Sequence, residues 1–167
     1  ECLVGSEMCI RDRPYSDLSP APIPGRPSIA VPVLSNSASM GSGAELLEHD
    51  VLTGDLKLSQ EWVTQRVKPS NVQALRFIHA YGDSMKGTFN DGDILLVDTG
   101  IRLVDIDGVY VLCAHDRLFV KRVRQRWDGQ FEISSDNPSI KTSDLLDGRE
   151  QLDVRGRVLW AWNGQKL

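Results

Sequence analysis

Residues 109–124 read VYVLCAHDRLFVKRVR, and this stretch decides the class of fold that the chain can adopt. Two short runs, 109–114 and 118–124, are rich in β-branched and aromatic side chains, and Asp116 lies between them. Runs of this length and composition, bounded by turn-forming residues, are typical of β-strands. The stretch therefore predicts two consecutive strands.

The same pattern recurs on both sides of this stretch. Residues 29–33 form an earlier run whose Pro32 suits an edge strand. Residues 59–67 predict one or two helical turns with Ser59 as the cap. We therefore predict a mainly β domain with a short helical turn. The further strands that we expect lie at residues 74–80, 94–98, 131–134 and 154–162.

The N-terminal part of the chain does not share this pattern. Residues 1–13 (ECLVGSEMCIRDR) have neither a helical nor a strand period and resemble translated adapter sequence, so we expect an artefact or a disordered segment. Residues 14–28 contain five prolines and predict an extended linker, which implies a further domain upstream. Residues 29–167 are expected to form one domain, with a flexible loop of small and polar residues at 34–44.

Composition restricts the functions open to this chain. With 167 residues and 41% hydrophobic content, it can build one core. The formal charge of −4 argues against a DNA-binding surface, and the apolar runs are far shorter than the ~20 residues that a membrane span needs. The three cysteines, at 2, 9 and 113, show no disulfide or metal spacing. We expect a cytoplasmic protein without metal or cofactor, and Cys113 in the core.

Ser84 is the candidate nucleophile. The motif Gly82-Asp83-Ser84-Met85 follows a predicted strand, where a hydroxyl can enter a cleft and backbone N–H groups can converge on a developing oxyanion. A serine hydroxyl needs a base to take its proton. Taken alone, Ser84 could equally be a turn residue that caps backbone groups.

Lys121 is the candidate base. Strand alternation places it on one face with Phe119 and Val123, and places Arg122 on the other face, toward solvent. Desolvation on an apolar face would lower the pKa of the lysine amine toward the range useful to a base, so cleavage should rise with pH. Alone, Lys121 would be read as a surface lysine with a buried stem.

Together these motifs carry a resemblance. Gly82-Asp83-Ser84-Met85, Asp91-Gly92-Asp93 before a strand, Val120-Lys121-Arg122-Val123 and the turn Ser135-Asp136-Asn137-Pro138 resemble the LexA, UmuD and phage-repressor peptidases. The resemblance covers residues 29–167. It implies a β-clip fold shared with signal peptidases, a Ser84–Lys121 dyad, and oxyanion donors at the backbone N–H groups of Asp83 and Ser84.

The resemblance also implies a substrate and partners. In this family a loop of the same chain is cut, and alignment of that loop places the bond between Met40 and Gly41, where the family usually has Ala-Gly or Cys-Gly. The family implies stimulation by a RecA filament on single-stranded DNA and a homodimer formed with help from residues 154–162. Operator DNA would be bound only through a missing N-terminal helix-turn-helix domain.

Three other functions stay open. A dimerisation module of a regulator could keep the fold without cleavage, because Met40 departs from the usual residue. A UmuD-like polymerase accessory protein is disfavoured by the linker, and a signal-peptidase-like enzyme by the lack of a membrane anchor.

Other candidate residues are expected to have structural roles. His49, His79 and His115 have no matching acid for a triad, and Met85 is expected in the core. Trp160 and Trp162, which should share a strand face with Val158, are expected in the core or at a dimer contact.

Overall fold

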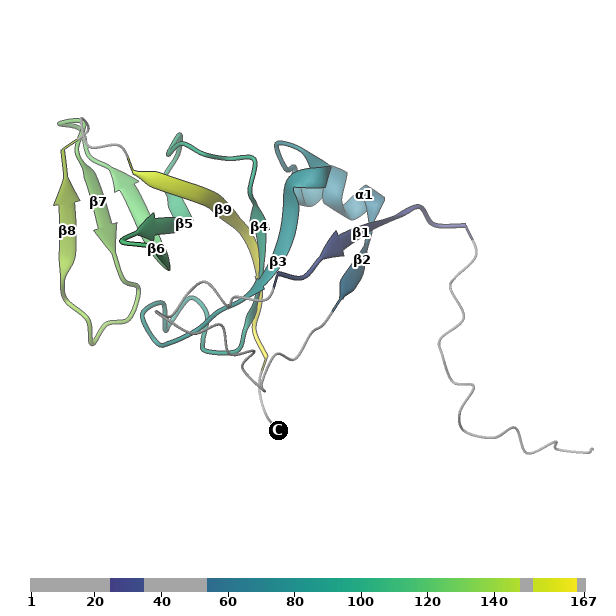
Figure 1. Ribbon diagram of the computed structural model, residues 1–167, viewed down its shortest axis with the longest axis horizontal. Helices are drawn as coiled ribbons and strands as arrows, with labels where there is room; N and C mark the ends of the chain where they lie inside the picture. Colours follow the sequence, from purple (N-terminus) through teal and green to yellow (C-terminus); the bar gives the residue numbers. More distant parts are fainter. Residues whose placement is uncertain (1–24, 35–53, 148–151, 165–167) are drawn as a thin grey trace, which may run out of the picture.

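The computed structural model describes residues 25–34, 54–147 and 152–164. Within these ranges the chain is mainly β, with a short helical region at residues 60–67 and a single 3₁₀ turn (Val72–Ala74), which confirms the predicted fold class (Figure 1). The proposed artefact at residues 1–13, most of the proline-rich linker, and the Met40–Gly41 bond lie outside the described residues.

The described part of the chain contains nine strands. They are β1 (Ser28–Pro32), β2 (Asp55–Ser59), β3 (Leu75–His79), β4 (Ile94–Asp98), β5 (Gly108–Ala114), β6 (Arg117–Gln125), β7 (Phe131–Ser134), β8 (Ser143–Leu146) and β9 (Asp153–Trp162).

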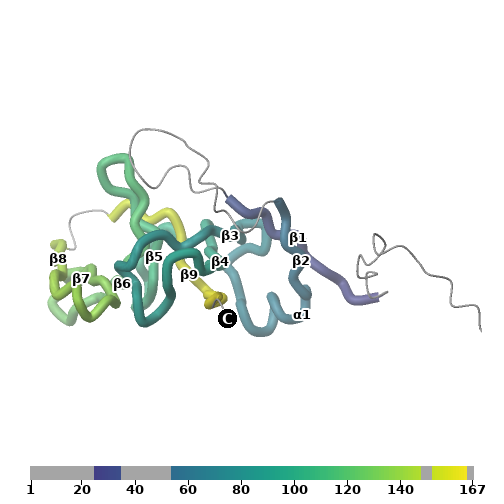
Figure 2. Tube along the Cα trace, turned by 90° about the horizontal axis from the view of Figure 1, so that it is seen from below, coloured from purple at the N-terminus to yellow at the C-terminus, as the bar shows by residue number. Residues whose placement is uncertain are grey.

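Seven of these strands form one antiparallel sheet in the order β3-β4-β9-β5-β6-β7-β8. The strand latest in sequence, β9, therefore lies in the middle of the sheet, between β4 and β5 (Figure 1). It joins the β3–β4 hairpin to the β5–β8 meander. Along the tube in Figure 2 the meander occupies one end of the molecule and β1 and β2 the other.

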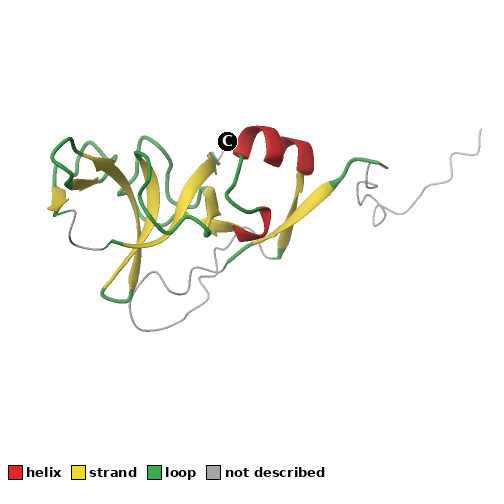
Figure 3. Ribbon diagram, turned by 90° about the horizontal axis from the view of Figure 1, so that it is seen from above, coloured by secondary structure: helices red, strands yellow, loops and turns green. Residues whose placement is uncertain are grey.

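A small sheet and the helical region lie beside the edge strand β3. β1 and β2 pair antiparallel, and Val33 forms a bridge with Phe77 of β3. Helix α1 (Gln60–Trp62) continues into a π-helical turn (Val63–Val67) beside these strands (Figure 3). The side chain of Ser59 accepts a hydrogen bond from the Trp62 N–H at 3.5 Å, which confirms it as the cap.

Three clusters of buried side chains stabilise the fold. The first, here called the cavity cluster, contains Ile78, Ala80, Met85, Phe89, Leu95, Val97 and Val111. The second packs the helical region and β1 against β3 and β4, and the third lies between β5, β6 and β9. Met85 is 2% exposed, as predicted for a core residue.

Two irregularities let β9 curve across the sheet. Its register shifts against Leu96/Val97 of β4 and against Val111/Leu112 of β5. At Gly156 the backbone passes so close to β4 that an added Cβ would lie 2.6 Å from Val97 Cγ1 and 2.8 Å from the Asp98 carbonyl oxygen. Only glycine fits this crossing without displacing backbone.

Several predictions at the level of single residues were wrong. Val158 does not share a face with both tryptophans: it packs against the cavity cluster, whereas Trp160 contacts Trp62 of the helical region at 5.1 Å between ring centroids. The register shift between Val158 and Trp160 breaks the alternation that the prediction assumed. Cys113 is half-buried near the end of β5 rather than in the core.

Candidate functional site

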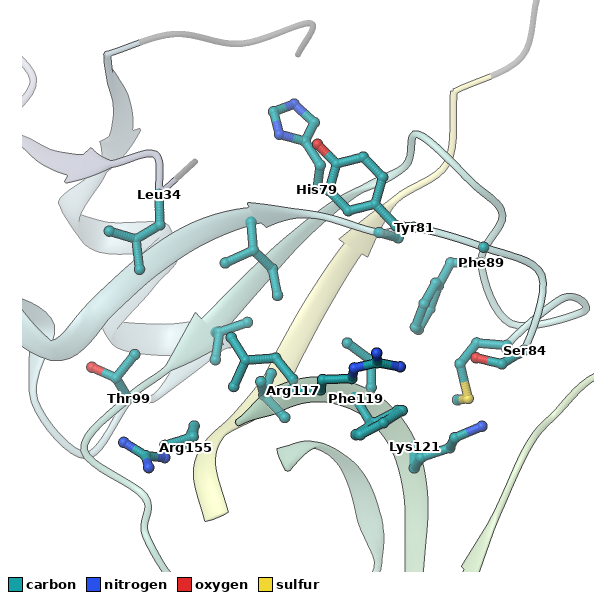
Figure 4. Close-up of a pocket in the computed structure, with 18 residues that line it drawn as sticks. Leu34, His79, Tyr81, Ser84, Phe89, Thr99, Arg117, Phe119, Lys121 and Arg155 are labelled. Carbon is teal, nitrogen blue, oxygen red and sulfur yellow. The ribbon is translucent and has the colours of Figure 1, made fainter. Parts of the chain in front are cut away.

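A largely apolar cavity of about 340 Å³ lies between the turn after β3 and the strand β6. Its walls come from the cavity cluster and from residues 117–121. Ser84 and Lys121 both line it and lie toward the same end, whereas Leu34 and Thr99 lie toward the other (Figure 4). The structure thus brings the two predicted dyad residues to one site, and their catalytic roles remain predictions.

The turn that carries Ser84 is held by local bonds and by a buried neighbour. Gly82 adopts φ 79°, a left-handed conformation that favours glycine, and its N–H donates to Asp91 Oδ1 at 2.7 Å. Met85 anchors the turn in the cavity cluster. Because the next side chain is fixed in the core, the half-buried Ser84 is left at the cavity wall.

Lys121 lies on β6 opposite Tyr110 of β5 and is half-buried. Its Nζ donates a hydrogen bond of 2.7 Å to Ser135 Oγ, just after β7. The face on which it lies is apolar but buried only in part, because Val123 is fully buried whereas Phe119 is 41% exposed. The amine therefore meets both an apolar wall and a hydroxyl partner.

The segment after β7 is hydrogen-bonded to the turn that carries Ser84. Asn137 is 4% exposed, and its Nδ2 donates to the Asp83 carbonyl oxygen at 2.8 Å. Its backbone N–H donates to the Ser84 carbonyl oxygen at 3.1 Å. Asn137 thus binds two consecutive backbone carbonyl groups, that of Asp83 and that of Ser84.

Arg122 does not face solvent freely, which corrects the prediction. Its Nε and Nη2 donate to the two carboxylate oxygens of Asp136, each at 2.6 Å, and Thr88 Oγ1 donates to the same carboxylate at 2.5 Å. The hydrogen bond from Arg122 is the main reason that the pKa of Asp136 is lowered. The segment after β7 is therefore tied to β6 as well as to residues 83–88.

Sequence reasoning missed Ser135 and Asn137 as members of the site. The motif Ser135-Asp136-Asn137-Pro138 was interpreted only as a turn that resembles the family's turn. Their partners lie 14 and 54 residues away in the chain, so no local pattern signals the contacts. Of the predicted oxyanion donors, Asp83 and Ser84 both lie in the turn that Asn137 binds.

A serine and a lysine at one end of an apolar cavity in a β domain define a candidate serine hydrolase site in which an amine would serve as the base. Comparison with protein families then identifies the chain. Residues 32–159 match the model described as Peptidase S24-like, and the chain belongs to this family. The predicted resemblance to LexA-like peptidases is thereby confirmed, and the mainly β structure is that of an S24 domain.

Two relatives show where such a domain occurs. The chain is 34% identical over 88 residues to the 26 kDa repressor protein of Escherichia phage HK022, covering 52% of this chain and 37% of the relative. It is 32% identical over 82 residues to an uncharacterized HTH-type transcriptional regulator of Haemophilus influenzae, covering 48% and 34%. The match thus spans about a third of the length of each relative.

The described ranges contain neither a candidate metal site nor a helix that could span a membrane. No three or more His, Cys, Asp or Glu side chains there are grouped so that they could hold a metal ion. None of the helices in that part of the chain has the length and apolar content needed to cross a bilayer.

Proposed function

We propose that this chain is the regulatory domain of a transcriptional repressor and that it cuts its own Met40–Gly41 bond with a Ser84–Lys121 dyad. The observation that carries the proposal is that Ser84 and Lys121 lie toward one end of a single apolar cavity in an S24 domain (Figure 4). Family membership supports the peptidase class, and the similarity to a phage repressor and to an HTH-type transcriptional regulator supports the regulatory role.

The first chemical step is attack on the Met40 carbonyl carbon by Ser84 Oγ, whose proton passes to Lys121 Nζ. A neutral amine has one lone pair and two N–H groups. With one N–H donated to Ser135, the lone pair is left to accept the proton of Ser84. The negative charge on the former carbonyl oxygen would be stabilised by the backbone N–H groups of Asp83 and Ser84.

Collapse of the tetrahedral intermediate breaks the bond to the Gly41 nitrogen, which receives the proton from Lys121. The resulting ester between Met40 and Ser84 is then hydrolysed by a water molecule, with Lys121 again as the base. The same two side chains therefore serve both halves of the reaction.

The position of Leu34 at the cavity supports an intramolecular substrate. Leu34 lines the cavity toward the end away from Ser84, and its N–H donates to the Phe77 carbonyl oxygen at 2.8 Å (Figure 4). Six residues lead from Leu34 to Met40, and an extended chain spans about 3.3 Å per residue, enough to cross a cavity of this size. An apolar wall also suits the thioether side chain of methionine.

Control and assembly follow from the proposed role. A RecA filament on single-stranded DNA would stimulate cleavage by favouring the state in which residues 35–53 occupy the cavity. Homodimerisation would use β9, whose Trp160 and Trp162 are 41% and 37% exposed. Operator DNA would be bound by a helix-turn-helix domain upstream of the linker.

Incubation of the purified chain at neutral to alkaline pH tests the proposal. We expect a fragment that begins at Gly41, formed at a rate that rises with pH because a protonated amine cannot accept the serine proton. Ser84→Ala and Lys121→Met should yield none, and a tenfold dilution should leave the rate constant unchanged, as an intramolecular reaction requires. No Gly41 fragment at any pH, with or without activated RecA, would leave a non-cleaving dimerisation module as the function.

A further inference from the structure

We infer that Asn137 is a positioning residue that sets the direction of the Ser84 N–H, the donor proposed to bind the oxyanion. The inference rests on the proposed function, and it deepens that function by assigning a role to a residue outside the dyad. It starts from the hydrogen bond of 2.8 Å between Asn137 Nδ2 and the Asp83 carbonyl oxygen.

The peptide bond between Asp83 and Ser84 links this hydrogen bond to the direction of the Ser84 N–H. The described residues contain no cis peptide bond, so the Asp83 C=O and the Ser84 N–H point in opposite directions from one rigid plane. A bond that holds the carbonyl toward Asn137 therefore turns the N–H away from it. Ser84 lines the cavity in which the substrate would lie, and Asn137 does not line it.

The partners of Asn137 also fix the orientation of its amide. The Ser139 N–H can only donate, so Oδ1 accepts from it at 2.9 Å. The Asp83 carbonyl can only accept, so Nδ2 faces it. Since a flipped amide would lose both bonds, and the side chain is 4% exposed, Asn137 has a single favourable orientation.

Asparagine differs from aspartate in a way that makes this position testable. In Asn137→Asp the side chain keeps its size and its acceptor for Ser139, but it presents an oxygen to the Asp83 carbonyl oxygen. The two acceptors repel, and the peptide plane is free to rotate. In Asn137→Ala the bond is lost without repulsion. In both variants the backbone N–H of residue 137 can still donate to the Ser84 carbonyl oxygen.

The experiment measures two reactions of the full chain across a pH series. The first is self-cleavage. The second is modification of Ser84 by diisopropyl fluorophosphate, followed by intact mass. In that reaction Oγ forms a bond to phosphorus, fluoride leaves, the serine proton passes to Lys121, and the phosphoryl oxygen takes the oxyanion position. The second reaction uses a small reagent in place of residues 35–53, so it does not require them to dock.

We expect Asn137→Asp to slow both reactions about 10²-fold, the usual effect of losing one oxyanion donor, and Asn137→Ala to slow them less. The pH midpoint of the Asn137→Ala profiles should stay unchanged, because this variant adds no charge and the lost contact does not involve Lys121. Val63→Ala, a fully buried change in the helical region, serves as a matched destabilised control that should keep the wild-type rates while folded. Thermal unfolding identifies the temperature at which every variant is folded.

Two results would overturn the inference, and they differ from failure of the proposed function. Variants of Asn137 that react within threefold of wild type would show that Asn137 does not position the donor. Rates that fall equally in Val63→Ala, in proportion to lost stability, would show a structural role only. If the wild-type chain neither cleaves nor reacts with the fluorophosphate, the proposed function fails and the inference fails with it.

Discussion

Replacement of Asp136 by Asn tests how the segment after β7 is held against the rest of the domain. The carboxylate accepts two bonds of 2.6 Å from Arg122 and one of 2.5 Å from Thr88. Hydrogen bonds to charged groups contribute about 1.5–3 kcal/mol, and an amide can still accept one of these. The Arg122 and Asp136 side chains are only 27% and 13% exposed, so solvent weakens the pair little. We expect Asp136→Asn to lower the free energy of unfolding by about 2 kcal/mol at pH 7.

The effect should depend on pH with a definite sign. The pKa of Asp136 is lowered in the folded protein, chiefly by the hydrogen bond from Arg122. A lowered carboxyl pKa stabilises the fold fully above the unfolded value of about 3.9, and that stabilisation is lost as pH falls through the lower folded value. The difference between wild type and Asp136→Asn should therefore shrink below about pH 4.

Urea and thermal unfolding at several pH values measure this effect. A loss of about 2 kcal/mol corresponds to a fall in Tm of about 4–8 °C for a chain of this size. Asp153→Asn is the control, because the side chains of Arg155 and Asp153 are each 49% exposed and their pair should contribute little. Equal stability of Asp136→Asn and wild type at pH 7, or an undiminished difference at pH 2, would refute the reasoning.

Three further predictions follow from other contacts. Ser135→Ala should slow self-cleavage about tenfold, because it removes the hydrogen bond that orients the Lys121 amine. Ser135→Thr keeps the hydroxyl and should keep most of the rate, and a gel-based time course measures both. Gly156→Ala should destabilise the domain by about 1–3 kcal/mol in urea unfolding because its Cβ would meet β4, whereas Gly108→Ala, with its nearest contact at 3.5 Å, should be tolerated. Trp160→Ser should shift sedimentation toward the monomer without lowering secondary structure by circular dichroism, and an unchanged sedimentation coefficient would exclude this face from a dimer contact.

The strands that sequence predicted best are those with a continuous apolar pattern. β4 and β7 were predicted with their observed bounds, and β3, β5, β6 and β9 to within one residue at each end. β2 (Asp55–Ser59) and β8 (Ser143–Leu146) were missed. Both are short and mostly exposed, so their own side chains give little strand signal. They form strands because each pairs with a neighbouring strand.

The candidate site was predictable only where a motif marks it. Ser84 and Lys121 stand in recognisable local sequences, so their presence at one cavity could be expected. The ion pair of Arg122 could not, because strand alternation gives the face of a side chain but not the residue that covers that face. The same holds for Ser135 and Asn137, whose roles depend on a turn meeting a segment that is distant in sequence.

The central place of β9 bears on when the chain can act during its synthesis. The connection between β3 and β4 carries Ser84, and β6 of the meander carries Lys121, while β9 lies between the hairpin and the meander in the sheet. A nascent chain would therefore lack the completed sheet that brings Ser84 and Lys121 to one cavity while its earlier segments emerge. Under the proposed function, this strand order would delay self-cleavage until translation is nearly complete.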